Sequence, residues 1–129
     1  MPRLSNYVVG AYIASIIAQC AHAAVWTVDD DGADFPGADF SDIQSAVDTA
    51  SNGDEVLVYP GTYTGSGTWA VELGYQQSIW LHSVGGAAVT IIDGQNIRVC
   101  YKHISDSTLE GFTLTNGSSA GNGAGAWCY

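Results

Sequence analysis

The chain has 129 residues, of which 47% are hydrophobic and only 12% are charged. This composition excludes a disordered acidic tail, a coiled coil and collagen. Three Lys and Arg residues against thirteen Asp and Glu residues give a formal net charge of −10. Such a surface repels phosphate backbones, so we expect no nucleic-acid partner.

The first residues have the pattern of a secretory signal peptide. Arg3 precedes an apolar run over residues 8–18, and Ala21 and Ala23 place small residues at alternate positions. The run is shorter than the roughly 20 residues that span a bilayer. We therefore predict a signal peptide over residues 1–23, secretion or display on the outer cell surface, and no transmembrane segment after cleavage. The alternatives are an uncleaved anchor and a lipoprotein signal.

Two cysteines, Cys100 and Cys128, remain after the predicted cleavage. An even cysteine number in an exported chain permits one disulfide but does not require it. Neighbouring strands in a stacked sheet lie about 4.8 Å apart, which a disulfide can bridge. The alternative, equally open, is two buried thiols that pack as small apolar groups.

An acidic turn follows the first predicted strand, which spans residues 25–28. Its carboxylates come from Asp29, Asp30, Asp31 and Asp34. Carboxylate oxygens are the ligands that calcium prefers, so these four residues form a candidate calcium site. The turn lacks the glutamate and the preceding helix of an EF-hand, and a solvated acidic turn is the favoured alternative.

A short amphipathic helix is the best-defined local element. Ser41 and Gln44 have the spacing of a capping box, and Gly53 supplies a left-handed residue that ends the helix. The apolar face consists of Ile43, Ala46, Val47 and Ala50. Their spacing of three and four residues predicts a helix that packs this face on a core.

After the helix, the sequence changes to short apolar runs separated by glycine turns. Strands are expected at residues 56–59, 71–73, 78–81, 89–92, 97–101 and 108–115. Residues 90–94 and 113–117 share one pattern, a β-branched or aliphatic strand closed by an Asx-Gly turn. This weak internal repeat is typical of a solenoid, whose coils bury their inner faces only when stacked. The alternative is an antiparallel β-sandwich.

The sequence also resembles a known family. Residues 39–50 and 52–63 contain the pattern Phe-x-x-Ile-Gln-x-Ala-Val-Asp, followed by Gly-Asp-x-Val-x-Val-x-Pro-Gly-Thr-Tyr. This pattern resembles the N-terminal cap and first strand of right-handed parallel β-helix proteins of the pectin-lyase-like superfold. Residues 89–94, 109–117 and 121–128 are similar to later coil phrases of that family, although Trp127 stands where an aliphatic residue or Met is usual.

The resemblance implies an all-β fold, a right-handed parallel β-helix with a short N-terminal capping α-helix. Residues 24–55 would form the first strand and the capping helix, and residues 56–129 the first coils. The helix would cover strand edges at one end of the solenoid. No polar cap follows the last coil, so we expect a fragment of a longer solenoid that self-associates through its exposed C-terminal edge.

The family contains polysaccharide lyases and hydrolases as well as non-catalytic adhesins. Similarity to the lyases would imply an Arg or Lys base and calcium-binding carboxylates. Only Arg98 and Lys102 could act as that base, and neither lies in a recognisable catalytic motif. We therefore expect a non-catalytic module for carbohydrate binding or surface adhesion. The alternative is the N-terminal part of an enzyme acting on acidic polysaccharide.

Aromatic residues are the candidate ligand-binding groups. They are Tyr63, Trp69, Tyr75, Trp80 and Trp127. If these rings face outward they can stack on sugar rings, and if they face inward they belong to the core or to contacts between coils. Their direction therefore decides between a binding surface and a plain scaffold.

Overall fold

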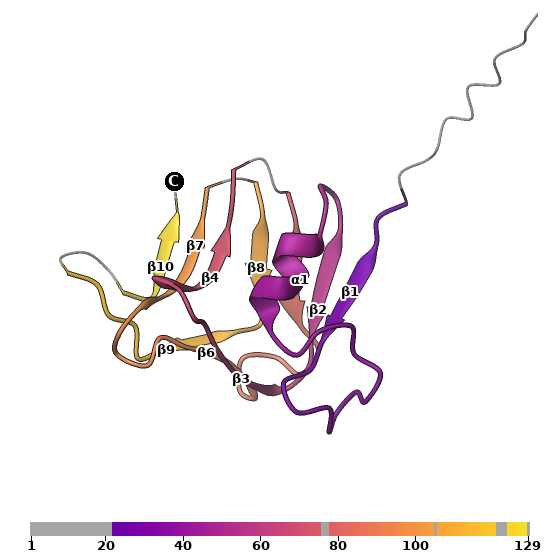
Figure 1. Cartoon of the computed structure of the whole chain (residues 1–129), viewed down its shortest axis with the longest axis horizontal. Coiled ribbons are helices and arrows are strands. Elements are labelled where there is room, and N and C mark those ends of the chain that lie inside the picture. Colours follow the sequence, from indigo (N-terminus) through magenta and orange to yellow (C-terminus); the bar gives the residue numbers. More distant parts are fainter. Residues whose placement is uncertain (1–21, 76–77, 105, 121–123, 129) are drawn as a thin grey trace, which may run out of the picture.

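The computed structural model describes residues 22–75, 78–104, 106–120 and 124–128, without the side chains of residues 127 and 128. In this part the protein is mainly β, with parallel sheets and one short helix (Figure 1). One sheet contains, in spatial order, β1 (Val25–Val28), β2 (Glu55–Val58), β5 (Trp80–Ser83) and β8 (Thr108–Glu110). A second contains β3 (Gly61–Thr64), β6 (Thr90–Asp93) and β9 (Thr113–Thr115). The third contains β4 (Trp69–Leu73), β7 (Val99–His103) and β10 (Ala126–Cys128).

Consecutive strands lie in different sheets. From β2 onward the chain passes through the β2, β3 and β4 sheets in turn, and it repeats this order with β5 to β7 and with β8 to β10. Each strand pairs in parallel with its counterpart in the preceding round, as Glu55 pairs with Trp80 and Trp80 with Thr108. Parallel pairing of this kind needs a long connection between partners, and here the other two strands of the round provide it.

Helix α1 (Ile43–Thr49) begins and ends differently from the prediction. Its N-cap is Asp42, whose Oδ1 accepts a hydrogen bond from the Ser45 amide at 2.8 Å, so the predicted capping box at Ser41 was placed one residue early. The helix ends at Ala50, which is extended, and Gly53 lies beyond it with a φ of +88°. Aspartate is as good a cap as serine, so the composition alone does not separate the two registers.

The predicted strand runs also needed two corrections. Strand β3 was missed because Gly61 and its Thr and Tyr neighbours follow Pro60 and have the composition of a turn. The predicted strand at residues 108–115 is two strands, β8 and β9, which belong to different sheets. Gly111, with a φ of +79°, turns the chain between them.

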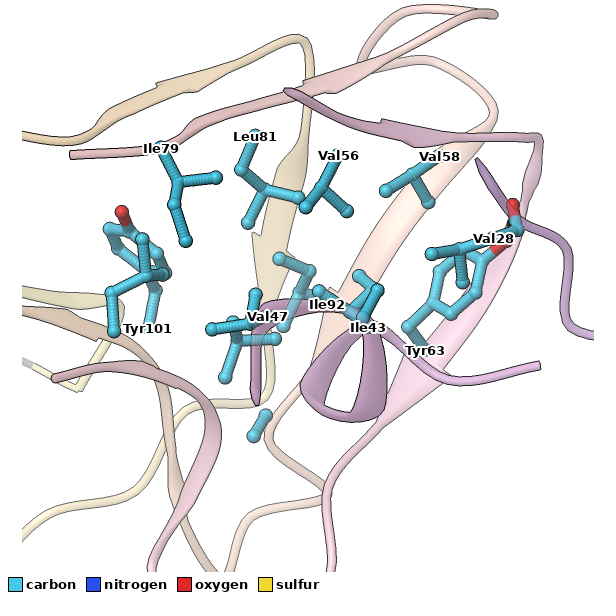
Figure 2. Packing of buried hydrophobic residues seen from close by; sticks show 14 of the residues in the cluster. Val28, Ile43, Val47, Val56, Val58, Tyr63, Ile79, Leu81, Ile92 and Tyr101 are labelled. Atoms are coloured by element: carbon cyan, nitrogen blue, oxygen red, sulfur yellow. Dashed lines mark hydrogen bonds between the residues drawn. The ribbon is translucent and has the colours of Figure 1, made fainter. Parts of the chain in front are cut away.

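The core lies between the three sheets and under the helix, and Figure 2 shows its packing. Val56, Leu81 and Ile92 come from two of the sheets and are fully buried, and Tyr101 comes from the third. The apolar helix residues Ile43, Ala46, Val47 and Ala50 are buried as well. One continuous hydrophobic core thus joins the helix to every sheet.

Helix α1 is seven residues long, and no helix in the described ranges has the length and apolar character needed to cross a membrane. The predicted signal peptide, residues 1–23, lies almost entirely outside the described residues.

Candidate functional site

An open groove of about 780 Å³ lies beside α1 and β4. Its walls come from the helix, from the loop after β3 and from β4; they are lined by Asp42, Gln44, Ser45, Asp48, residues 64–68, Trp69, Ala70 and Glu72. A second hollow is lined by Gln44, Asp48, Glu72, Gly74 and Tyr75. Because three lining residues are shared, the two hollows form one continuous surface, which we call the helix groove.

Gln44 holds the two walls of the helix groove together. Its Oε1 accepts a hydrogen bond from the Glu72 amide at 2.8 Å, and its Nε2 donates to the Glu72 carbonyl oxygen at 3.0 Å. Strand β4 is an edge strand, and this side-chain amide occupies the backbone groups that a further strand would use. Gln44 Nε2 also donates to Asp48 Oδ1 at 2.8 Å, which fixes that carboxylate on the helix.

The charged groups of the helix groove are mostly acidic. Glu72 is ion-paired with Lys102 on the neighbouring strand β7, with 2.7 Å between Oε1 and Nζ. The same ammonium lies 4.7 Å from the ring centroid of Trp69, a cation–π contact. Lys102, predicted as a catalytic candidate, is therefore engaged by both a carboxylate and an aromatic ring.

Two of the predicted aromatic residues lie on the helix groove. Trp69 is half-buried at the start of β4, and Tyr75 is 77% exposed beyond the end of the same strand. Strand β4 places the two rings along one groove, with the polar side chains of Asp48 and Glu72 also lining it. Aromatic residues together with hydrogen-bonding groups suit a sugar chain, which has apolar C–H faces and polar edges.

Trp80 lies elsewhere, in strand β5. Its ring is 45% exposed and stacks on His82, with 3.9 Å between centroids and 14° between planes. Its Nε1 donates to Glu110 at 3.3 Å, and His82 Nε2 lies 2.5 Å from Glu55 Oε1. Trp80 is thus held in a cluster of its own and shares no lining residue with the helix groove.

The prediction that Tyr63 binds a ligand is wrong. Tyr63 is 3% exposed, and its hydroxyl donates to the Tyr59 carbonyl oxygen at 2.9 Å. Burial, together with the nearby charge of Asp30, raises the pKa of Tyr63. The ring fills the core beside Val28, as Figure 2 shows, so it has no face to offer a sugar. The side chain of Trp127 is outside the described part of the chain.

The acidic turn brings three of its four predicted residues together. Ligand oxygens of Asp29, Asp30 and Asp31 lie within 4.8 Å of one another, without Asp34. Asp29 is buried and accepts a hydrogen bond from the Phe35 amide at 2.5 Å, which lowers the pKa of its carboxyl group. The Asp30 and Asp31 carboxylates likewise accept backbone amides, so these side chains hold the loop in place.

Arg98, the other predicted catalytic candidate, has hydrogen-bond partners different from those of Lys102. Its Nη1 donates to Gln95 Oε1 at 2.6 Å, and its Nε donates to the Gly67 carbonyl oxygen at 3.1 Å. It lines a hollow of about 360 Å³ that shares Thr68 and Trp69 with the helix groove. Both basic side chains thus contact lining residues of the helix groove, Arg98 at Gly67 and Lys102 at Glu72, and each is held by partners of its own.

Cys100 is a buried free thiol whose Sγ lies 3.1 Å from the Thr115 carbonyl oxygen. Burial raises the pKa of the thiol. In the strand register Cys128 is opposite His103, three residues along from Cys100. That offset is about 10 Å along a strand, beyond the Cα separation that a disulfide tolerates. The sequence left a disulfide and two buried thiols as alternatives, and Cys100 is a buried thiol. The side chain of Cys128 lies outside the described part of the chain.

Sequence analysis missed Asp48 and Glu72 as site residues, and it assigned Gln44 only to helix capping. Glu72 could have been noticed because it interrupts the buried residues Val71 and Leu73. Asp48 follows Gln44 by one helical turn, on the side away from the apolar face. The family resemblance places the helix over strand edges at one end of the fold, but it does not identify β4 as the strand beside Gln44 and Asp48.

No protein-family model matches this chain, and no curated protein or solved structure matches it either.

Proposed function

We propose that this chain is a carbohydrate-binding module of a secreted or cell-surface right-handed parallel β-helix protein, and that the helix groove is its binding site. The β-helix is supported by the strand order, in which three parallel sheets are visited in turn around one core. It is also supported by the cap-like pattern of residues 39–63. Secretion is supported by the signal-peptide pattern of residues 1–23.

The observation that carries the binding proposal is the placement of Trp69 and Tyr75 along one polar groove. The helix groove is open to solvent, so a ligand chain longer than the groove can lie along it. Asp48 and Glu72 accept hydrogen bonds from sugar hydroxyls, and the rings cover the C–H faces. Two polar walls held by Gln44 preorganise this surface, which reduces the entropic cost of binding.

Calorimetric titration with a panel of neutral, cationic and anionic hexasaccharides tests the proposal. We expect binding of at least one of them, and a loss of about fivefold to tenfold in affinity for Tyr75→Ala, which removes an exposed ring. Trp80→Ala is the matched control, because it removes an exposed ring from a separate cluster and should leave affinity unchanged. Absence of binding across the panel, or a loss only in Trp80→Ala, would overturn the proposal.

A further inference from the structure

The helix groove has an excess of negative charge. Asp42, Asp48 and Glu72 line it, and no Lys, Arg or His is among its described lining residues. Two basic groups lie at its edge: the Lys102 ammonium, which is paired with Glu72, and Arg98, whose Nε donates to the carbonyl oxygen of the lining residue Gly67 at 3.1 Å. Three carboxylates line the groove against two cations at its edge, and of these two only Lys102 is paired with a groove carboxylate.

The three carboxylates differ in how far their oxygens are already occupied by hydrogen bonds within the protein. Asp42 is the N-cap of α1, and both of its carboxylate oxygens accept hydrogen bonds from Ser45. Asp48 is exposed and accepts one hydrogen bond, from Gln44, on a single oxygen. Glu72 contacts Lys102 through Oε1. Asp48 and Glu72 thus retain capacity to accept further donors, and both line the hollow that contains Trp69 and the hollow that contains Tyr75.

We propose that the helix groove selects saccharides that carry protonated amino groups, with Asp48 and Glu72 as the acceptors and Trp69 and Tyr75 as the stacking faces. This inference rests on the proposed carbohydrate-binding function and names its ligand class. An ammonium group forms charge-assisted hydrogen bonds with carboxylates, and it is also attracted to aromatic faces. The contact between Lys102 and Trp69 is an example of this pairing within the protein.

The same charges disfavour acidic polysaccharides. A uronate carboxylate in this groove would meet Asp48 and Glu72, and the net charge of −10 adds long-range repulsion. A neutral glycan would make the stacking contacts without the charge-assisted bonds. The groove therefore predicts an order of affinity in which cationic hexasaccharides bind most tightly and anionic ones most weakly.

Titration of the folded protein with three hexasaccharides of equal length tests this order. The probes are β-1,4-linked glucosamine hexasaccharide, cellohexaose and a galacturonic acid hexasaccharide, at about pH 5.5, where free carboxyl groups are ionised and amino-sugar amines are protonated. We expect the glucosamine oligomer to bind best and to lose affinity as salt is raised. Asp48→Asn keeps the hydrogen-bond acceptor for Gln44 and should weaken only this ligand, by about threefold.

Asp34→Asn is the matched control, because it removes one exposed negative charge from the acidic turn, which does not line the groove. It should leave the affinity for the glucosamine oligomer unchanged. Equal losses in Asp48→Asn and Asp34→Asn would show attraction to the overall charge and would overturn the inference. Cellohexaose binding as tightly as the glucosamine oligomer would overturn it while leaving carbohydrate binding intact. No binding by any of the three would count against the proposed function itself.

Discussion

The ammonium of Lys102 lies 2.7 Å from Glu72 Oε1 and bridges strands β7 and β4 at the edge of the helix groove. Replacing Lys102 with Met retains the aliphatic stem and removes the cation. Because Glu72 is then free for a ligand ammonium, we expect the glucosamine hexasaccharide to bind about threefold more tightly in Lys102→Met. Calorimetric titration measures the change. Arg98→Met removes the other described basic side chain and should alter this affinity less.

Lyase activity is the alternative that the sequence left open, and the arrangement of basic residues argues against it. Lys102 is held in an ion pair with Glu72, and Arg98 is hydrogen-bonded to Gly67 and Gln95. We expect no unsaturated product from acidic polysaccharides, in calcium or in chelator. Calcium-dependent product absorbance that disappears in the Lys102→Ala plus Arg98→Ala double variant would place the chain among the lyases.

The acidic turn is expected to be insensitive to calcium. The carboxylates of Asp29, Asp30 and Asp31 each accept at least one backbone amide, so they already have a structural role. Thermal unfolding in millimolar calcium should give the same midpoint as unfolding in chelator. A higher midpoint in calcium that is lost in Asp31→Asn would instead show that the turn binds the cation.

Asp54 joins three segments near the start of the fold. Its carboxylate accepts hydrogen bonds from the Ala24 amide at 2.8 Å, the Trp26 indole at 3.1 Å and the Ser51 amide at 2.8 Å. The amides of Ser51 and Ala24 lower the pKa of Asp54 from its ordinary 3.8. Loss of these bonds in Asp54→Ala should reduce the free energy of unfolding by about 3 kcal/mol.

The same lowered pKa fixes the sign of the pH dependence. The unfolded chain takes up the proton first, so the stabilisation is complete above the ordinary value of 3.8 and is lost as pH falls below it through the folded-state pKa. Urea unfolding at a series of pH values should therefore show a flat region near neutrality and a decline in acid. Asp54→Asn should show a smaller decline than the wild type; an equal decline would mean that Asp54 does not contribute.

Gly94 tests whether the turns of successive rounds are in close contact. A Cβ at this position would collide with the carbonyl oxygens of Arg98 and Asn116, and the Gly94 amide donates to the Thr115 carbonyl oxygen at 2.9 Å. We expect Gly94→Ala to lower the free energy of unfolding by about 2 kcal/mol or more. Gly37→Ala, where a Cβ meets nothing within 4 Å, should change it by less than about 0.5 kcal/mol.

The sequence predicted local elements well where short-range signals decide them. The apolar spacing of Ile43 and Val47 identified the helix, and short runs of β-branched residues identified most strands. One error occurred where two neighbouring residues carry the same signal. Asp42 is the N-cap of α1, and Ser41 directly before it is an equally good capping residue. Strand β3 was missed because its residues have the composition of a turn and contain no apolar run.

The helix groove could be predicted only in part. Trp69 and Tyr75 were selected as single aromatic residues, but their common groove depends on α1 lying against β4, a contact between segments far apart in the chain. Tyr63 has the same aromatic character as Tyr75 and is buried. The direction of a ring is set by the register and by the turn before its strand, and composition does not reveal it.

The measurement that tests the central claim most directly is a two-dimensional NMR titration that follows the tryptophan indole N–H signals as hexasaccharides are added. Trp69→Phe and Trp80→Phe assign two of these signals. The account predicts that the Trp69 signal moves with saturation, most strongly for the glucosamine oligomer, while the Trp80 signal stays in place. Movement of the Trp80 signal alone, or of neither signal at saturating ligand, would contradict it.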